Sequence, residues 1–308
     1  MQVMMAESAG FCYGVKRAVD MARETAKKCR HSVMLGSIIH NANVVAELED
    51  LGMRKVDSWD QVRPGETVVI RSHGERKRVL DGLEARGAAC VNATCPNVLR
   101  IQQLVAQAQE EGRTPLIIGE MHHPEVLGAA SWSERSVILP GPRELENWLN
   151  EEPSRRNMPL TATAQTTCVQ GIWESSKEIL KKQCTNAKIF DTICNATHRR
   201  QTEAAELAAQ VDVMVVVGDR KSANTKHLAE ICREKCGRVV QIERAGELSS
   251  ELFEGCLVAG LTAGASTPAG IIKEVYTTMS EEIKNMESNE ESFEELLEKS
   301  FKTLNTGE

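Results

Sequence analysis

Three cysteines, each followed 24 residues later by a glycine, constrain the fold of this chain more than any other feature of its sequence. The pairs are Cys12 and Gly36, Cys95 and Gly119, and Cys194 and Gly218. Each cysteine separates a short apolar run from a stretch with apolar residues at helical spacing, and each glycine ends a strand-like run. The spacing therefore predicts a threefold internal repeat.

Each repeat continues with a polar loop, a helical stretch and a second strand-like run. The strand-like runs end near residues 35, 70, 118, 163, 217 and 259. Strand, loop and helix in regular order are typical of a parallel sheet with crossover helices. We therefore expect an α/β fold of three pseudo-threefold-related α/β lobes with parallel sheets around a central cavity. The lobes are predicted at residues 1–92, 93–191 and 192–279, followed by an acidic amphipathic tail or linker at 280–308.

The charge of the chain is concentrated in that tail, which holds nine glutamates and three lysines, whereas the whole chain has a net charge of −7. The remainder is nearly neutral and lacks the basic footprint of a nucleic-acid-binding protein. No run approaches the roughly 18 apolar residues of a membrane span, and the first residues do not resemble a signal peptide. We expect a cytoplasmic protein whose ten cysteines are reduced thiols.

In open parallel sheets, ligands bind beyond the carboxyl ends of the strands. If the repeats are related by an approximate threefold rotation, Cys12, Cys95 and Cys194 meet in the central cavity. Each then lies at a helix start, where the helix dipole favours a thiolate. Three thiolates can hold zinc, completed by a histidine or water, or three irons of a 4Fe-4S cluster with the fourth iron open. The residues alone leave both metal centres open.

Polar residues in the loops beyond the strands form a second set. Three of the seven histidines belong to it, together with two serines and an asparagine: His40, His73, His123, Ser222, Asn224 and Ser266. Such groups can donate to phosphate oxygens, with protonated histidines supplying positive charge. Each residue taken alone fits a solvated loop position or a helix cap, but their recurrence in three repeats favours a binding site.

Glu125 follows His123 and Pro124 in one of these loops. In a cavity its pKa would rise, so that it could donate a proton. The alternative is a solvated glutamate at a helix start, where the helix dipole favours its charge.

Five separated motifs resemble those of the 4-hydroxy-3-methylbut-2-enyl diphosphate reductase family, in order over residues 1–279. They are Gly10-Phe11-Cys12-Tyr13-Gly14-Val15, Ala93-Thr94-Cys95-Pro96, His123-Pro124-Glu125, Gln165-Thr166-Thr167 and Gly264-Ala265-Ser266-Thr267-Pro268. The resemblance implies a three-lobed α/β enzyme around a 4Fe-4S cluster that has one iron free of protein thiolate. The cluster ligands it implies are Cys12, Cys95 and Cys194.

The resemblance also implies a reaction, the reductive dehydroxylation of the family's allylic diphosphate to isopentenyl and dimethylallyl diphosphate. Two electrons would come from a donor of ferredoxin or flavodoxin type. Glu125 and Thr166 would deliver a proton to the departing hydroxyl, and His123 would help position the diphosphate. The other implied diphosphate ligands are His40, His73, Ser222, Asn224 and Ser266.

Two short segments depart from the family pattern. The chain has Glu7-Ser8-Ala9 where the family commonly has Asn-Pro-Arg, and Ser222-Ala223-Asn224 where it has Ser-Ser-Asn. The second change removes a hydroxyl, so Ala223 is expected to bind diphosphate through its backbone.

Residues 292–308 are similar to the segment that precedes an RNA-binding module of ribosomal-protein-S-one type, and nucleic acid is an expected partner only if that module follows residue 308.

The alternative to the reductase hypothesis is a non-catalytic phospholigand-binding protein with a structural zinc site.

Overall fold

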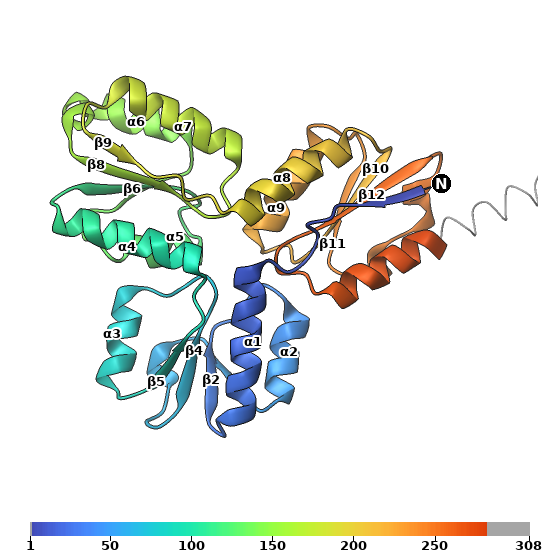
Figure 1. The fold of residues 1–308 in the computed structure, drawn as a ribbon, viewed down its shortest axis with the longest axis horizontal. Coiled ribbons are helices and arrows are strands. Elements are labelled where there is room, and N and C mark those ends of the chain that lie inside the picture. The colour runs from blue at the N-terminus through green and yellow to red at the C-terminus, as the bar shows by residue number, and fades with distance from the viewer. Residues whose placement is uncertain (1, 282–308) are drawn as a thin grey trace, which may run out of the picture.

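Three parallel four-stranded sheets surround one centre in the computed structural model, which describes residues 2–281 (Figure 1). One sheet has the order β3-β2-β4-β5, formed by Arg54–Val56, Ser32–Leu35, Thr67–Ile70 and Ala89–Asn92. A second has the order β7-β6-β8-β9, formed by Val137–Leu139, Thr114–Ile118, Leu160–Ala164 and Ala187–Ile189. The third has the order β1-β12-β10-β11, formed by Gln2–Met5, Val258–Ala263, Val213–Val217 and Val239–Ile242. The expected threefold arrangement of α/β lobes is confirmed.

The first strand, β1, departs from the predicted lobe boundaries. Residues 2–5 were assigned to the first lobe, yet β1 pairs in parallel with β12 in the third sheet, with Val3 opposite Ala259. The position of β1 there matches those of β5 and β9 at the ends of the other two sheets. Each of these edge strands precedes one of the three repeated cysteines. By pairing with β12, β1 therefore completes the third sheet in the same way, with residues from the opposite end of the described chain.

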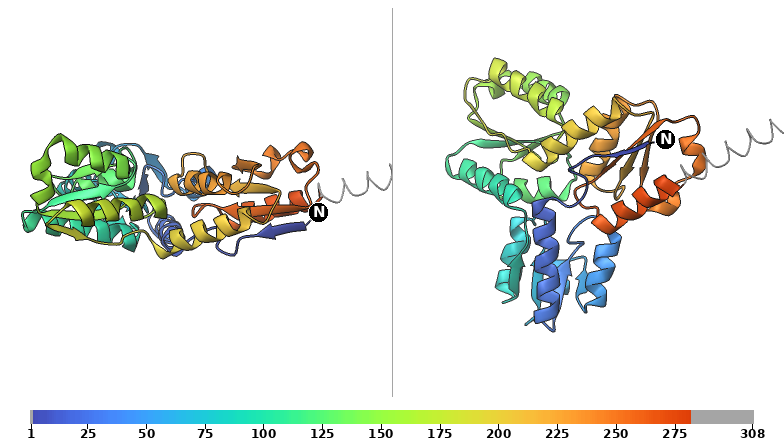
Figure 2. Two further views of the ribbon diagram at one scale, coloured as in Figure 1. Left: turned by 90° about the horizontal axis from the view of Figure 1, so that it is seen from above. Right: turned by 45° about the vertical axis from the view of Figure 1, so that its right-hand side comes forward.

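Helices cover both faces of every sheet, and the molecule is flat when seen from the side (Figure 2). They are α1 (Tyr13–Lys28), α2 (Ala42–Asp50), α3 (Lys77–Ala85), α4 (Pro96–Glu110), α5 (Pro124–Ala130), α6 (Pro142–Glu151), α7 (Gln170–Gln183), α8 (Asn195–Ala208) and α9 (Ala223–Arg233). Residues 269–281 are also helical. Short 3-10 turns lie at 59–61, 153–157, 245–247 and 250–253. No helix in the described residues is long and apolar enough to span a membrane.

The central strands are buried on both faces because each sheet lies between two layers of helices. β2, β6, β8 and β10 contain only buried residues, as expected for near-continuous apolar strands of a parallel sheet. Each lobe therefore has its own core on either side of its sheet. This leaves the loops at the strand ends free to form a site between the lobes. The predicted tail falls almost wholly outside the described residues.

Candidate active site

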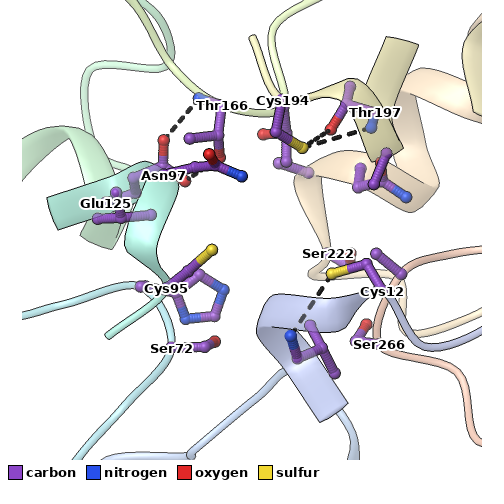
Figure 3. A pocket seen from close by; sticks show the side chains of 18 of the residues that line it. Cys12, Ser72, Cys95, Asn97, Glu125, Thr166, Cys194, Thr197, Ser222 and Ser266 are labelled. Atoms are coloured by element: carbon purple, nitrogen blue, oxygen red, sulfur yellow. Dashed lines mark hydrogen bonds between the residues drawn. The ribbon is translucent and has the colours of Figure 1, made fainter. Parts of the chain in front are cut away.

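A central cavity lies where the three lobes meet, with an empty volume of about 710 Å³ that includes its opening to solvent. All the predicted site residues line it: Cys12, Cys95, Cys194, His40, His73, His123, Glu125, Thr166, Ser222, Ala223, Asn224 and Ser266. Figure 3 shows side chains from all three lobes around this space.

The three cysteines occupy equivalent positions, because each is the N-cap of the helix that follows it. Cys12 Sγ accepts from the Val15 amide at 3.5 Å, and Cys194 Sγ accepts from the Thr197 amide at 3.3 Å. Cys95 caps α4 without such a bond, and Pro96 follows it. The three sulfur atoms therefore lie at three helix N-termini, where the helix dipole and backbone amides face the cavity.

Burial nevertheless raises the pKa of the Cys95 and Cys194 thiols, and negative charge on the neighbouring cysteines raises it further, although the nearby helix-start amides lower it. The helix-start amides thus act in the expected direction, whereas burial opposes them in these two residues. A bound metal cation overcomes the effect of burial, because each thiol loses its proton when its sulfur binds the metal. The other seven cysteines lie outside the cavity and are free thiols. Three converging cysteines without a fourth match a centre that keeps one coordination position open.

The histidines form a compact group at another part of the cavity. The ring centroids of His40 and His73 are 4.7 Å apart, those of His73 and His123 5.6 Å, and those of His40 and His123 6.4 Å. Burial lowers the pKa of all three, that of His123 to about 4. The expected protonated histidines are therefore neutral in the ligand-free protein near pH 7, and each still has one N–H to donate.

One nitrogen atom from each of these rings lies within 4.8 Å of the other two, which is close enough for the three to hold a metal ion. His123 Nδ1, however, accepts a hydrogen bond from the Glu125 amide at 3.2 Å. This bond leaves the proton of a neutral ring on Nε2, which is then a donor and not a metal ligand. His40 Nε2 and His73 Nδ1 are buried without a partner among the described residues. The group is thus better suited to an oxyanion than to a cation.

The third lobe adds further donors at the start of α9. Ser222 caps this helix, with its Oγ accepting from the Thr225 amide at 3.4 Å, and Ala223 is the first helical residue. The amide of a first helical residue has no partner within its helix, so Ala223 offers a backbone donor. Asn224 Nδ2 and Ser266 Oγ are buried without partners among the described residues. These orphaned groups fit a buried ligand with several oxygen atoms.

Glu125 is 2% exposed and interacts with Thr166 on the neighbouring strand end. Its Oε1 accepts from the Thr166 amide at 2.6 Å, and its Oε2 accepts from Thr166 Oγ1 at 2.7 Å (Figure 3). Burial raises the pKa of Glu125 to about 6 even though both hydrogen bonds lower it. A carboxyl group that titrates near neutrality beside a hydroxyl can transfer a proton.

Several cavity residues were not identified from the sequence: Ser72, Asn97, Thr167, Thr197 and Arg200. Ser72 precedes His73 and donates from Oγ to the Ile38 carbonyl at 3.1 Å, and its adjacency to the histidine was an available signal. Thr197 Oγ1 lies 3.1 Å from Cys194 Sγ, one helical turn beyond the cysteine. The cavity position of Arg200 could not be predicted from its residue type, because arginines in amphipathic helices are mostly exposed.

The fold and the cavity together define a three-lobed α/β protein with three cysteines beside a group of buried polar side chains in one central cavity. The sequence model of the LytB protein family matches residues 3–280, and the chain belongs to this family.

Proteins similar to it carry the name 4-hydroxy-3-methylbut-2-enyl diphosphate reductase. One from Caldanaerobacter subterraneus subsp. tengcongensis is 38% identical over 95% of this chain and 100% of its own length. One from Anaeromyxobacter sp. (strain Fw109-5) is 41% identical over 89% of this chain and 95% of its own. One from Clostridium acetobutylicum is 38% identical over 94% of this chain but only 45% of its own, so that relative is much longer.

Two solved structures are also similar. One is described as (E)-4-hydroxy-3-methyl-but-2-enyl diphosphate reductase, the terminal enzyme of the non-mevalonate pathway; it is 35% identical, with a TM-score of 0.66 over 91% of this chain and 100% of that one. The other, the reductase from Plasmodium falciparum, is 23% identical, with a TM-score of 0.84 over 90% of this chain and 87% of that one, and supports the fold alone.

Proposed function

We propose that this chain is an oxidoreductase that converts 4-hydroxy-3-methylbut-2-enyl diphosphate, with two electrons and two protons, into isopentenyl or dimethylallyl diphosphate and water. The observation that carries the proposal is the meeting of three kinds of group in one cavity: three cysteines, a set of oxyanion donors, and a carboxyl group with a pKa of about 6. Family membership and the names of the relatives support the same activity.

Cys12, Cys95 and Cys194 would hold a 4Fe-4S cluster, because three helix-capping thiols line the cavity and no fourth cysteine does. When bound, the cluster would supply single electrons and a Lewis-acidic iron without a protein ligand. A structural zinc would instead be closed by four protein ligands, so the rival binding protein is not favoured.

His40, His73, Asn224 and Ser266 would hold the diphosphate, with Ser222 and the Ala223 amide at the start of α9. Burial of neutral imidazole, amide and hydroxyl donors supports this role, because a dry site strengthens each hydrogen bond to an anion. The negatively charged diphosphate would itself favour protonated histidines, so binding is expected to take up protons. His123 would donate from Nε2, held in that tautomer by the Glu125 amide.

Glu125 would supply the proton that leaves with the hydroxyl group as water, and Thr166 would relay or orient it. The two hydrogen bonds to Thr166 fix the carboxyl group, and its raised pKa keeps part of it protonated near neutral pH. The second proton ends on carbon in the product. The electrons would come from a ferredoxin- or flavodoxin-type donor, and ten free thiols are consistent with the reducing cytoplasm.

Anaerobic purification followed by metal and sulfide analysis tests this function against its rival. We expect a brown protein with about four irons and four sulfides per chain, as a 4Fe-4S centre requires. It should consume the hydroxylated diphosphate when given a low-potential reductant. A colourless protein with stoichiometric zinc, inactive after cluster reconstitution, would refute the proposal and support a binding protein.

A further inference from the structure

Arg200 is a buried charge in the wall of the central cavity. It lies on α8, six residues after Cys194, and only 3% of it is exposed. It lines the central cavity together with Cys12 and Cys194, and also an outer hollow on the side of Glu7 and Arg199. The guanidinium group thus stands between two cysteine ligands and the protein surface.

The hydrogen bonds of Arg200 connect the two cysteine segments. Its Nη2 donates to the carbonyl of Gly10, two residues before Cys12, and its Nη1 donates to the carbonyl of Ala196, two residues after Cys194. Nε is buried and has no partner among the described residues. A side chain that holds both segments and retains a spare donor can position both sulfur atoms.

No carboxylate hydrogen-bonds to this guanidinium in the described structure. The nearby Glu203 is already engaged, since its Oε2 accepts from Ser8 and its Oε1 accepts from Arg199. Burial lowers the pKa of Arg200, whereas the negative charges of Cys12 and Cys194 raise it most among its neighbours. Arginine keeps its proton in proteins, so Arg200 places a positive charge without a hydrogen-bonded carboxylate in the same cavity wall as Cys12 and Cys194.

We propose that Arg200 is a positioning residue whose fixed positive charge, held beside the Cys12 and Cys194 thiolates, makes the bound cluster easier to reduce. An added electron interacts favourably with a nearby cation, and the local charge and hydrogen bonding around the sulfurs set the potential of an iron–sulfur centre. This inference rests on the proposed function, because it requires a redox cluster on these cysteines.

The test is an anaerobic redox titration of the cluster-loaded protein, followed by electron paramagnetic resonance. The variants are Arg200→Gln, which removes the charge, Arg200→Lys, which keeps it, and Arg199→Gln as the control. Arg199 is adjacent on α8 but exposed, and it pairs with Glu7 and Glu203. In Arg200→Gln the ratio of reduced to oxidised cluster at a fixed potential should fall about tenfold, a shift of about 59 mV for one electron. Arg200→Lys and Arg199→Gln should stay within about twofold of the wild type.

An unchanged potential in Arg200→Gln overturns the inference, as does an equal loss in Arg200→Lys. If Arg200→Gln does not retain the cluster, the test uses wild-type protein grown with arginine that carries ¹⁵N in its guanidino group. We then expect a ¹⁵N coupling to the reduced cluster in pulsed resonance spectra, and its absence refutes the proposal. A protein that holds no iron–sulfur cluster refutes the proposed function and this inference together, whereas a cluster indifferent to Arg200 refutes only the inference.

Discussion

Glu125 is the residue whose chemistry depends most on its surroundings. A glutamate in water is ionised near pH 7, but this one is 2% exposed and its pKa is raised to about 6. Burial prevails over two short hydrogen bonds from Thr166, both of which favour the ionised form. The side chain therefore exchanges its proton within the pH range of ordinary metabolism.

Replacing the acid by its amide tests this role directly. Glu125→Gln keeps the size of the side chain and an oxygen acceptor for Thr166, so the fold and the iron content should be retained. Turnover should fall by about 10²- to 10⁴-fold, the usual contribution of a general acid. Product formation under saturating reductant gives the rate. Glu134→Gln is the control, because Glu134 lies in the same lobe, is exposed and does not line the cavity. Equal rates in wild type and Glu125→Gln would exclude proton donation by Glu125.

The pH dependence of turnover is a second test at this scale. Only the protonated form of Glu125 can donate, so turnover should decline as the pH rises through about 6. The Thr166 hydroxyl lowers the pKa of Glu125, and Thr166→Val should therefore move this decline to higher pH while reducing the maximum rate. Thr166→Ser keeps the hydroxyl and should keep the profile. A decline at the same pH in all three proteins would mean that another group controls it.

Stability should follow the same titration in the ligand-free protein. The folded pKa of Glu125 is above the unfolded value, so its contribution to folding is complete below about 4.5 and is lost as the pH rises through about 6.

At the scale of elements, the starts of α1 and α7 give a matched comparison. The second residue of each helix is a glycine, Gly14 in α1 and Gly171 in α7. A Cβ on Gly14 would lie 2.5 Å from Cys95 Sγ, whereas one on Gly171 would have no atom within 4 Å. The approach of α1 to Cys95 therefore depends on the missing side chain.

Gly14→Ala should lose most of its bound iron, because a sulfur held as a ligand has no freedom to rotate away from the new methyl group. Gly171→Ala should keep its iron and gain up to about 1 kcal/mol in unfolding free energy from helix propensity. Iron content per chain and urea unfolding measure the two effects. Full iron content in Gly14→Ala would show that the cluster tolerates a shift of Cys95.

The start of α9 allows a gain-of-affinity prediction. Ala223 lies in the cavity at the first position of the helix, where a serine in its place would add a hydroxyl group. Ala223→Ser should tighten inorganic diphosphate binding about fivefold, the equivalent of one net hydrogen bond of about 1 kcal/mol. Ser222→Ala should act in the opposite direction and also cost about 1 kcal/mol of stability by removing the helix cap. Titration calorimetry with diphosphate measures both, and unchanged affinity in both variants would place the anion away from α9.

Features of the fold that depend on neighbouring residues could be predicted from the sequence, whereas those that depend on residues far apart in the chain could not. The inner strands and the helices follow mostly from local apolar spacing, as does the position of Cys12, Cys95 and Cys194 at helix starts. The edge strands β3, β7 and β11 were not predicted. The pairing of β1 with β12 joins residues more than 250 positions apart, and a four-residue strand carries no local sign of its partner. The neutral state of His73 arises from desolvation, and both that desolvation and the burial of Arg200 depend on the assembled lobes.

At the scale of the whole molecule, three separate cores are connected by polar contacts. The amide of Gln170 donates to Gln201 Oε1 at 3.1 Å between the second and third lobes, and His227 Nδ1 lies 2.8 Å from the Thr167 carbonyl. Between the first and second lobes the Lys77 amide donates to Ser131 Oγ at 2.8 Å. Interfaces of this kind contribute less than a shared apolar core, so ligands in the cavity should add much of the cohesion between lobes.

Removal of the metal should therefore weaken the whole assembly. Each lobe supplies one cysteine to the centre, so chelating the iron under anaerobic conditions should lower the melting temperature and broaden the transition seen by calorimetry. Inorganic diphosphate at about 100 times its dissociation constant should then stabilise the iron-loaded protein by about 2.7 kcal/mol, because its proposed donors also come from all three lobes. Cys184→Ser serves as the control, since Cys184 lies outside the cavity and its loss should leave both effects unchanged. An identical melting temperature with and without iron would mean that the polar contacts alone hold the three lobes together.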